Sequence, residues 1–585
     1  MLSVFAHREK GITRDVRKGR LLFVVLWVFA GLLAPAASAE YGSKSESYIV
    51  DTRHAKIYVE VVRPVDAAGQ TVKGPAIFTL SPYSILGRNG DAGRWVPRGY
   101  ARVWADVVGT GNSGGCYDYG GRREKETGYD LVEWIAAQPW STGKIGMIGG
   151  SYNGTTATAT AVTKPPHLTT IVPEAGISRW YEYAFSGGIR YFLNNENPTD
   201  EGVDTPLAFD FGFAIPPPLD VAGADWAERV ASTVRPCEEV EHTLHGYDND
   251  TPDYDAFWLE RDYIVDAGSI DIPVMVAHNW GDWNVKQEEG VNLYRALTGS
   301  PDKKLYMGTR WSGHGRPGGD YQKTVDAWFD HYLMGVANGI ESSPDVVSQT
   351  STYDGPAAWN AGPWPRTTAV RLQAQFAPEE GLDDYPWKLL PRKPKPRLER
   401  AGLSIGANTE TAALADPRKN TQWLWFESPP LAQDVRIFGN PDVKIRSTIE
   451  RTWITYTPTI VDIDLSKRVV APGTLAATDE RGLISTTRGW LDSRYRRTLA
   501  SPSLVTPGSP FTMTVVEKPQ DYTFKRGHVI GLMLTTEIDD WSLPKPYPCS
   551  TPACALASIE WADGETSVTL PVVGAVSDPA SLFVP

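Results

Sequence analysis

The fold is decided by the stretch Lys144-Ile-Gly-Met-Ile-Gly-Gly-Ser-Tyr-Asn-Gly-Thr-Thr-Ala157, which joins an apolar strand to a helix of small residues through one sharp turn. Ser151 lies at this turn, after two glycines and three residues before Gly154. On an open α/β sheet a nucleophilic serine occupies such a turn, where strand and helix pack too closely for large side chains. The stretch therefore predicts a nucleophile at Ser151, and an ordinary glycine-rich turn is the alternative.

A strict Gly-x-Ser-x-Gly pattern occurs elsewhere, at Ser113 and Ser404. Ser113 follows an expected strand, but a loop rich in Gly and Tyr comes next instead of a helix. Ser404 lies in the β-rich C-terminal part of the chain. Because so short a pattern arises often by chance in a chain with 54 glycines, we expect neither serine to be the nucleophile.

Strands and helices alternate on both sides of Ser151. This alternation predicts βαβ units and a mostly parallel sheet with helices on both faces, which is an α/β fold. The expected strands cover residues 48–64, 74–80, 100–107, 144–148, 169–172, 272–277 and 304–307, and the expected helices cover 127–138, 151–162, 287–297 and 324–333.

Three regions are expected after the first 39 residues. An α/β-hydrolase core is predicted for residues 40–177 and 266–345. Residues 178–265 are aromatic, acidic and proline-rich and break the alternation, so we expect them to form a cap inserted over the sheet. Residues 346–585 contain short β-type runs separated by Pro and Gly, which predicts a C-terminal β-sandwich.

The composition is that of an ordinary globular protein. The chain has 585 residues, of which 41% are hydrophobic and 22% are charged. Its net charge of -13 argues against a nucleic-acid-binding protein, because such a protein needs a positive surface.

The first 39 residues predict a secretory signal peptide. A basic segment is followed by the apolar run Leu21–Ala34 and by the small residues Ala37-Ser-Ala39. The apolar run is shorter than the about 20 residues that span a bilayer as a helix. We expect cleavage after Ala39, a secreted or periplasmic protein and no membrane span in the mature chain. An N-terminal membrane anchor is the alternative.

Four cysteines make disulfides plausible in an exported protein. Cys549 and Cys554 are close enough in sequence to close a short loop, which leaves Cys116 for Cys237. Only proximity favours this pairing among the three that four cysteines allow. A zinc site is the alternative, although no histidine lies near Cys549 or Cys554 in the sequence.

The partners of a nucleophilic serine follow it along the chain in the order acid, then histidine, each after a strand. Asp282 follows the expected strand 272–277, and His314 lies in a Gly-rich loop after the expected strand 304–307. His278 precedes the acid and His331 lies within a helix, so both fit less well. We expect His314 to reach Asp282 and the Ser151 hydroxyl. Capping of the next helix is the alternative role for Asp282.

Several motifs resemble the superfamily of X-Pro dipeptidyl-peptidases and cocaine esterases. Gly149-Gly-Ser-Tyr-x-Gly154 is similar to its nucleophile turn, Asp106-Val-Val-Gly-Thr-Gly-x-Ser-x-Gly114 to its loop after a strand, and Gln138–Met147 to its approach to the serine. Ser81-Pro-Tyr83 resembles its Pro-Tyr turn. Val108 replaces the arginine that the family loop usually has. The run Asp282-Trp-Asn-Val-Lys286 looks most like the peptidase branch.

The resemblance implies a cap over the active site, a C-terminal jelly-roll-like domain and no cofactor. It also implies that the Tyr83 hydroxyl binds the oxyanion of the reaction. The backbone N–H of Tyr152, the residue after the nucleophile, is the expected second donor. Ser151, Asp282 and His314 would then hydrolyse an ester or a peptide through an acyl-enzyme.

We expect X-Pro dipeptidyl-peptidase activity, with hydrolysis of carboxylic or α-amino-acid esters as the alternative. The expected partner is a short peptide or a small ester, and the sequence leaves a homodimer open. Two other classes are a polymer-binding protein with an inactive core and a metal hydrolase that uses His278, Asp282 and His314. The latter lacks a compact ligand motif, so no metal is expected. Candidate carboxylates for a substrate ammonium group are Glu174, Glu196, Asp200 and Glu201, although each fits a solvated surface charge better.

Overall fold

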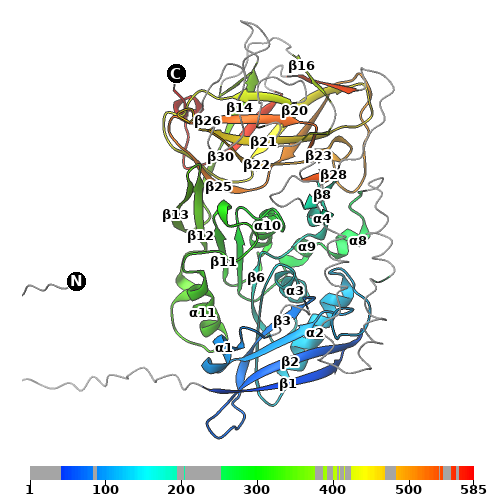
Figure 1. Cartoon of the computed structure of the whole chain (residues 1–585), viewed down its shortest axis with the longest axis vertical. Coiled ribbons are helices and arrows are strands. Elements are labelled where there is room, and N and C mark those ends of the chain that lie inside the picture. The colour runs from blue at the N-terminus through cyan, green and yellow to red at the C-terminus, as the bar shows by residue number, and fades with distance from the viewer. Residues whose placement is uncertain are drawn as a thin grey trace, which may run out of the picture. The chain divides into compact units, whose positions relative to one another are not determined.

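A computed structural model gives the arrangement of most of the chain (Figure 1). The expected signal peptide and the cysteines Cys549 and Cys554 lie outside the described residues, as do Glu196, Asp200 and Glu201. The structure describes residues 41–83, 89–193, 203–204, 237, 252–375, 387–391, 400–404, 407–408, 414, 423–467, 482–538, 541–543, 555–560 and 565–584.

The core is one mixed sheet that is parallel through its centre. Its strands lie in the order β1-β2-β4-β3-β5-β6-β10-β11-β12-β13. Pairing is parallel from β4 to β12 and antiparallel at both ends. The strands are β1 Gly42–Asp51, β2 Lys56–Val65, β3 Gly74–Ser81, β4 Ala101–Asp106, β5 Ser141–Gly150, β6 Leu168–Glu174, β10 Val274–Asn279, β11 Lys303–Gly308, β12 Val346–Thr352 and β13 Gly355–Gly362.

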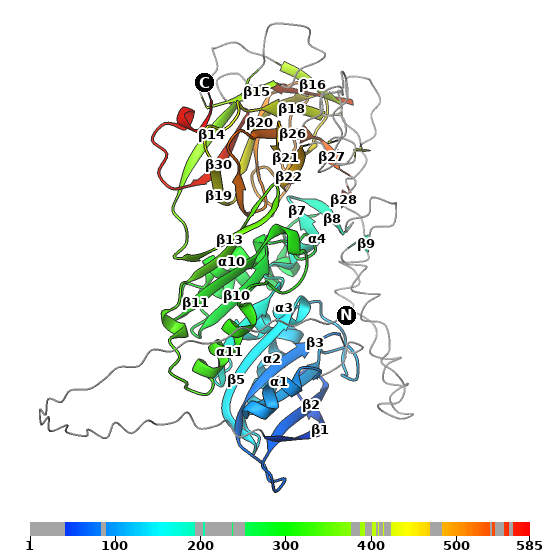
Figure 2. The same ribbon diagram turned by 60° about the vertical axis from the view of Figure 1, so that its left-hand side comes forward.

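Helices cover both faces of this sheet, as the sequence predicts (Figures 1 and 2). Alternate residues of one strand enter different clusters: Met147 packs with α2, α3 and α10, whereas Ile148 packs with α1 and α11. This alternation follows from the period of two in a β-strand. The helices are α1 Ala92–Trp95, α2 Arg122–Ala136, α3 Tyr152–Ala161, α10 Glu288–Ala296 and α11 Tyr321–Tyr332.

The expected cap is described only in part. Its described elements are α4 Trp180–Ala184, β7 Phe185–Ser186, β8 Ile189–Leu193, β9 Val203–Asp204, α8 Ala256–Glu260 and α9 Tyr263–Ala267. Trp180 and Tyr181 of α4 are buried in the same cluster as the core helices α2 and α3.

The C-terminal region is β-rich and pairs mainly antiparallel. The strands β14, β18, β21, β26 and β30 contribute to one apolar core, which includes Leu372, Phe426, Ile460, Leu532 and Leu570. The strands are β14 Thr367–Gln375, β15 Trp387–Leu390, β16 Arg400–Ser404, β17 Ala407–Asn408, β18 Trp423–Glu427, β19 Val435–Gly439, β20 Asp442–Ile449, β21 Thr455–Ile463, β22 Leu483–Arg488, β23 Leu491–Asp492, β24 Phe511–Val516, β25 Gln520–Phe524, β26 Val529–Thr535, β27 Glu537–Ile538, β28 Ser542–Leu543, β29 Leu556–Glu560 and β30 Ser567–Val573.

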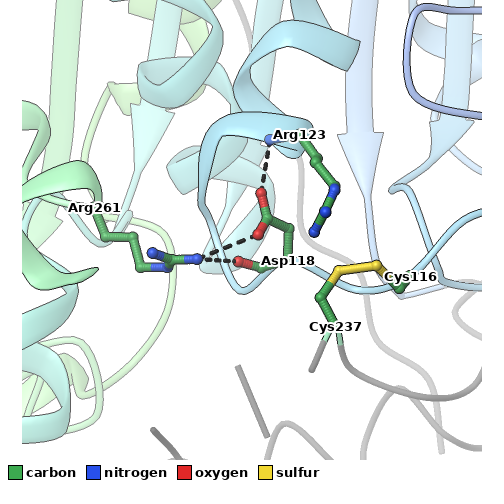
Figure 3. The surroundings of a disulfide bond; sticks show 5 residues. All are labelled: Cys116, Asp118, Arg123, Cys237 and Arg261. Atoms are coloured by element: carbon green, nitrogen blue, oxygen red, sulfur yellow. Dashed lines mark hydrogen bonds and ion pairs between the residues drawn. A yellow bond between two sulfur atoms is a disulfide. The ribbon is translucent and has the colours of Figure 1, made fainter. Parts of the chain in front are cut away.

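A disulfide joins Cys116, in the loop after β4, to Cys237, with the two Cα atoms 5.0 Å apart (Figure 3). The loop is fixed again two residues later. Asp118 accepts the backbone N–H of Arg123 at 2.6 Å and a guanidinium N–H of Arg261 at 3.2 Å. The loop that leads into α2 is therefore held by a covalent bond and by a buried ion pair.

Candidate active site

Ser151 occupies the turn between β5 and α3 in a strained backbone conformation, with φ of 60° and ψ of −128°. Such strain is typical of a nucleophile turn. The close packing explains two glycines of the motif. A Cβ atom on Gly149 would lie 2.3 Å from the Cβ of Asn153, and one on Gly154 would lie 2.7 Å from the carbonyl oxygen of Glu174.

The two expected oxyanion donors meet beside the serine. The Tyr83 hydroxyl donates to Ser151 Oγ at 3.0 Å, and it accepts the backbone N–H of Tyr152 at 3.3 Å. Burial raises the pKa of Tyr83, so its hydroxyl keeps its proton near neutral pH. Ser151, Tyr83 and Tyr152 thus surround one point at which a carbonyl oxygen could receive two hydrogen bonds.

Asp282 lies in the loop after β10 and is fully buried. Its Oδ2 lies 2.8 Å from His314 Nδ1 and 3.3 Å from His278 Nε2, and its Oδ1 accepts the backbone N–H groups of Asn284 and Val285 at 3.1 Å. Burial disfavours the charged carboxylate, but the hydrogen bonds from both histidines outweigh it and keep the pKa of Asp282 below its usual value. Asp282 is therefore an ionised acceptor.

His314 follows β11, and its contact with Asp282 fixes its tautomer. An ionised carboxylate only accepts, so Nδ1 carries the proton and Nε2 stays available as a base. Burial alone would lower the pKa of His314. The hydrogen bond to Asp282 and the charge of that carboxylate together outweigh burial, so the pKa of His314 is raised above its usual value. The expected bond to the nucleophile is absent: among the described residues Ser151 Oγ bonds to Tyr83, and no hydrogen bond joins it to His314.

The helix-capping alternative for Asp282 is wrong. The next helix, α10, begins at Glu288, and its N-cap residue is Gln287. Asp282 instead accepts the N–H groups of a turn at residues 284 and 285, directly after β10. This turn holds the carboxylate rigidly toward His314.

Four other candidate residues from the sequence make contacts that do not involve Ser151. Ser113 Oγ donates to the carbonyl oxygen of Asp106 and accepts the N–H of Tyr58. Ser404 lies at the end of β16, and its backbone pairs with that of β29. His331 contacts the carbonyl oxygen of Val336. His278 is buried against Asp282 and the Val285 carbonyl oxygen.

The sequence suggests that Glu174 is a solvated surface residue, but the structure shows that it is buried. It lies at the end of β6. A guanidinium N–H of Arg316 donates to its Oε2 at 3.0 Å, and the Tyr321 hydroxyl donates to its Oε1 at 2.7 Å. Both carboxylate oxygens therefore already have protein partners.

The sequence does not single out several groups around the triad. The Tyr183 hydroxyl donates to Asn284 Oδ1 at 3.1 Å, two residues after Asp282. Lys286 is fully buried, with its ammonium group 3.7 Å from the centre of the Tyr191 ring, and burial lowers its pKa. Asn284 and Lys286 belong to the quoted run 282–286, but Tyr183 and Tyr191 are about 100 residues away, so no local pattern joins them.

The C-terminal region supports both loops of the triad. Gln520 Nε2 donates to the carbonyl oxygen of Trp280 at 3.0 Å, two residues before Asp282. Arg310, four residues before His314, donates to the carbonyl oxygen of Ser485. The loops that carry Asp282 and His314 are therefore held by strands of the C-terminal region as well as by the core sheet.

Within the described ranges, no three or more His, Cys, Asp or Glu side chains are arranged to hold a metal ion. In the same part of the chain, no helix has the length and apolar character needed to cross a bilayer.

Replacing Tyr83 with phenylalanine should lower kcat by about 10²–10³-fold and change KM little, because one oxyanion donor is lost. Steady-state kinetics on a peptide amide would measure this. Tyr58→Phe is the control, since the Tyr58 hydroxyl bonds to Glu60 instead of to Ser151. A Tyr83→Phe enzyme within threefold of the original kcat would contradict the role.

Two family models match the chain in succession. A model described as X-Pro dipeptidyl-peptidase (S15 family) matches residues 52–315, which include Ser151, Asp282 and His314. A second, described as X-Pro dipeptidyl-peptidase C-terminal non-catalytic domain, matches residues 338–552.

Individual proteins resemble the chain over most of its length. A protein of Bacillus anthracis, provisionally named Xaa-Pro dipeptidyl-peptidase, is 28% identical and the match covers 84% of this chain and 82% of the relative. Two solved structures share the fold. An aminopeptidase from a marine sediment archaeon (Thaumarchaeota archaeon) has a TM-score of 0.68 at 16% identity and covers 92% of this chain and 97% of its own. An α-amino acid ester hydrolase has a TM-score of 0.66 at 19% identity, with coverage of 93% and 99%.

Proposed function

This chain belongs to the S15 family of X-Pro dipeptidyl-peptidases and is a serine hydrolase, and we propose that it releases X-Pro dipeptides from the N-termini of peptides. The observation that carries the proposal is the family match over residues 52–315 together with the placement of Ser151, Tyr83 and Tyr152 around one point. An α/β-hydrolase core supplies this arrangement at the carboxyl ends of its parallel strands.

The proposed reaction begins when Ser151 Oγ exchanges its hydrogen bond from Tyr83 for one to His314 Nε2. The serine attacks the carbonyl carbon of the substrate proline, and its proton passes to Nε2. The Tyr83 hydroxyl and the Tyr152 N–H stabilise the negative oxygen that forms. His314 then protonates the departing amine, and a water molecule releases the dipeptide from Ser151 by the same steps. Asp282 orients His314 and stabilises its charged form.

A dipeptidyl-peptidase must also recognise the free ammonium group of its substrate. Among the described groups near the triad, the side-chain oxygen of Asn284 is a hydrogen-bond acceptor. It accepts the Tyr183 hydroxyl. Glu174 is taken up by Arg316 and Tyr321. The other three candidate carboxylates lie outside the described residues, so the proposal is best tested with the substrate.

Acetylating the N-terminus of a Gly-Pro chromogenic amide should lower kcat/KM by about 100-fold or more, because the polar groups that bind the ammonium would be left unpaired. Kinetics on the free and the acetylated amide would measure this, with Gly-Ala amide as the control for proline. Ester hydrolysis is the second candidate, since the fold matches an α-amino acid ester hydrolase. Equal turnover of the free and the acetylated Gly-Pro amide, or cleavage of a short aryl ester without cleavage of either amide, would favour ester hydrolysis.

A further inference from the structure

The side chain of Tyr152 is anchored far below its backbone N–H. Tyr152 begins α3 and is completely buried. Its ring packs against Trp180, with ring centres 5.1 Å apart, and its hydroxyl donates to Glu124 Oε2 at 2.7 Å. Because the N–H and the anchored ring belong to one residue, the position of the ring restricts the direction of the N–H.

Glu124 lies in the first turn of α2 and points into the protein, with 1% of its surface exposed. Its Oε2 accepts both the Tyr152 hydroxyl and the backbone N–H of Gly120, the latter at 3.1 Å. Its Oε1 is buried and has no hydrogen-bond partner in the part of the chain that the structure describes. Burial raises the pKa of Glu124 to about 8, although the bonds from Tyr152 and Gly120 lower it. At neutral pH the side chain is therefore mostly uncharged.

The charged groups nearest to Glu124, Arg261 and Asp118, form an ion pair with each other. Arg261 donates to the carboxylate and the carbonyl oxygen of Asp118 (Figure 3). It also donates to the carbonyl oxygen of Tyr119, so it lowers the pKa of Glu124 only from a distance. The Asp118 carboxylate raises that pKa. Tyr263, from α9, donates to the Gly120 carbonyl oxygen and packs against the same site.

We propose that Glu124 is a positioning residue that sets the Tyr152 backbone N–H for the oxyanion. This inference rests on the proposed role of Tyr152 as an oxyanion donor, but it does not depend on whether the substrate is a peptide or an ester. Glu124 touches no reacting atom. It acts through the Tyr152 ring and through the Gly120 turn that precedes α2.

The proposal gives the enzyme an alkaline limit. Above pH about 8, Glu124 ionises in a buried site beside the Asp118 carboxylate, where no cation of the described residues forms an ion pair with it. The site must then admit water or shift, and the Tyr152 N–H shifts with it. The folding stability should also fall as the pH rises. Because the folded protein holds this proton to a higher pH than the unfolded chain does, the stabilisation present below pH about 4.5 is lost as the pH rises through about 8.

The test is the rate at which a neutral aryl phosphonate labels Ser151, measured from pH 6 to 9.5 in the full chain. This probe has no amine that titrates, so substrate ionisation cannot produce the alkaline limit. Glu124→Gln keeps an acceptor for Tyr152 and Gly120 but cannot ionise. We expect it to label within about threefold of the original rate at pH 7 and to lose the fall above pH 8. Glu133→Gln, a more exposed position on the same helix, is the control and should keep the fall.

Two further variants keep the result decisive. Glu124→Ala should label at least about tenfold more slowly at pH 7, and Tyr152→Phe should lose the alkaline fall as Glu124→Gln does. The proposal is overturned if Glu124→Gln retains the fall above pH 8, or if a folded Glu124→Ala labels at the original rate. If the unmodified protein is not labelled at Ser151 at all, the serine-hydrolase mechanism fails instead.

Discussion

Replacing Ser151 with alanine should lower kcat by about 10⁴–10⁶-fold and leave the fold intact, because the covalent route through an acyl-enzyme is lost. The expected residual activity comes from substrate binding and from the oxyanion donors Tyr83 and Tyr152. The thermal unfolding midpoint should change little, because alanine keeps the same strained backbone conformation and loses only the hydroxyl to which Tyr83 donates. Steady-state kinetics on a Gly-Pro amide, with a thermal unfolding curve, would measure both effects.

Ser404→Ala is the matched control, because Ser404 fits the strict Gly-x-Ser-x-Gly pattern but lies on β16 in the C-terminal region. It should keep the original kcat. Ser113→Ala should act on stability instead, since it removes hydrogen bonds to Asp106 and from Tyr58. A Ser151→Ala protein that keeps a tenth of the original activity would show that another residue is the nucleophile.

Replacing Asp282 with asparagine should lower kcat by about 10⁴-fold, because an amide can donate to His314 Nδ1 and favour the wrong tautomer. The pH profile should change as well. His314 must be uncharged to act as a base, so kcat/KM rises as the pH passes its pKa. Asp282 raises that pKa, so the acid limb of the variant should move to lower pH.

Asp271→Asn is the control for this change, since Asp271 precedes β10 and pairs with Lys164 at the surface. Its activity and its acid limb should match those of the original protein. An Asp282→Asn enzyme whose rate falls but whose acid limb stays in place would show that Asp282 does not set the charge state of His314.

The nucleophile turn and the order of the triad could be predicted from the sequence because their determinants are local. The small residues around Ser151 indicate that β5 and α3 pack closely there. Asp282 and His314 each follow a strand of a parallel sheet, whose carboxyl ends meet at one edge. Tyr83 was expected only through its resemblance to a family motif, since a Pro-Tyr turn alone indicates no oxyanion donor.

The supporting groups could not be predicted in this way. Glu124 and Tyr152 are 28 residues apart, and only the packing of α2 against α3 brings them into contact. Glu174 is an acidic residue followed by a glycine-containing turn, which favours a surface position. Its hydrogen-bond donors, Arg316 and Tyr321, are more than 140 residues away in the sequence. Chain order argues against His278 as the base, yet its ring contacts the same Asp282 oxygen as His314 does. In each case the partner is distant in sequence.

The disulfide between Cys116 and Cys237 also changes the covalent connectivity of the protein. The two cysteines are 121 positions apart and enclose the nucleophile turn and much of the expected cap. A protease that cuts once anywhere between them opens the backbone but releases no fragment. The nicked protein would run as one species on a denaturing gel until a thiol reductant separates it into two pieces. Ser151 would therefore stay covalently joined to Asp282 and His314 after such a cut.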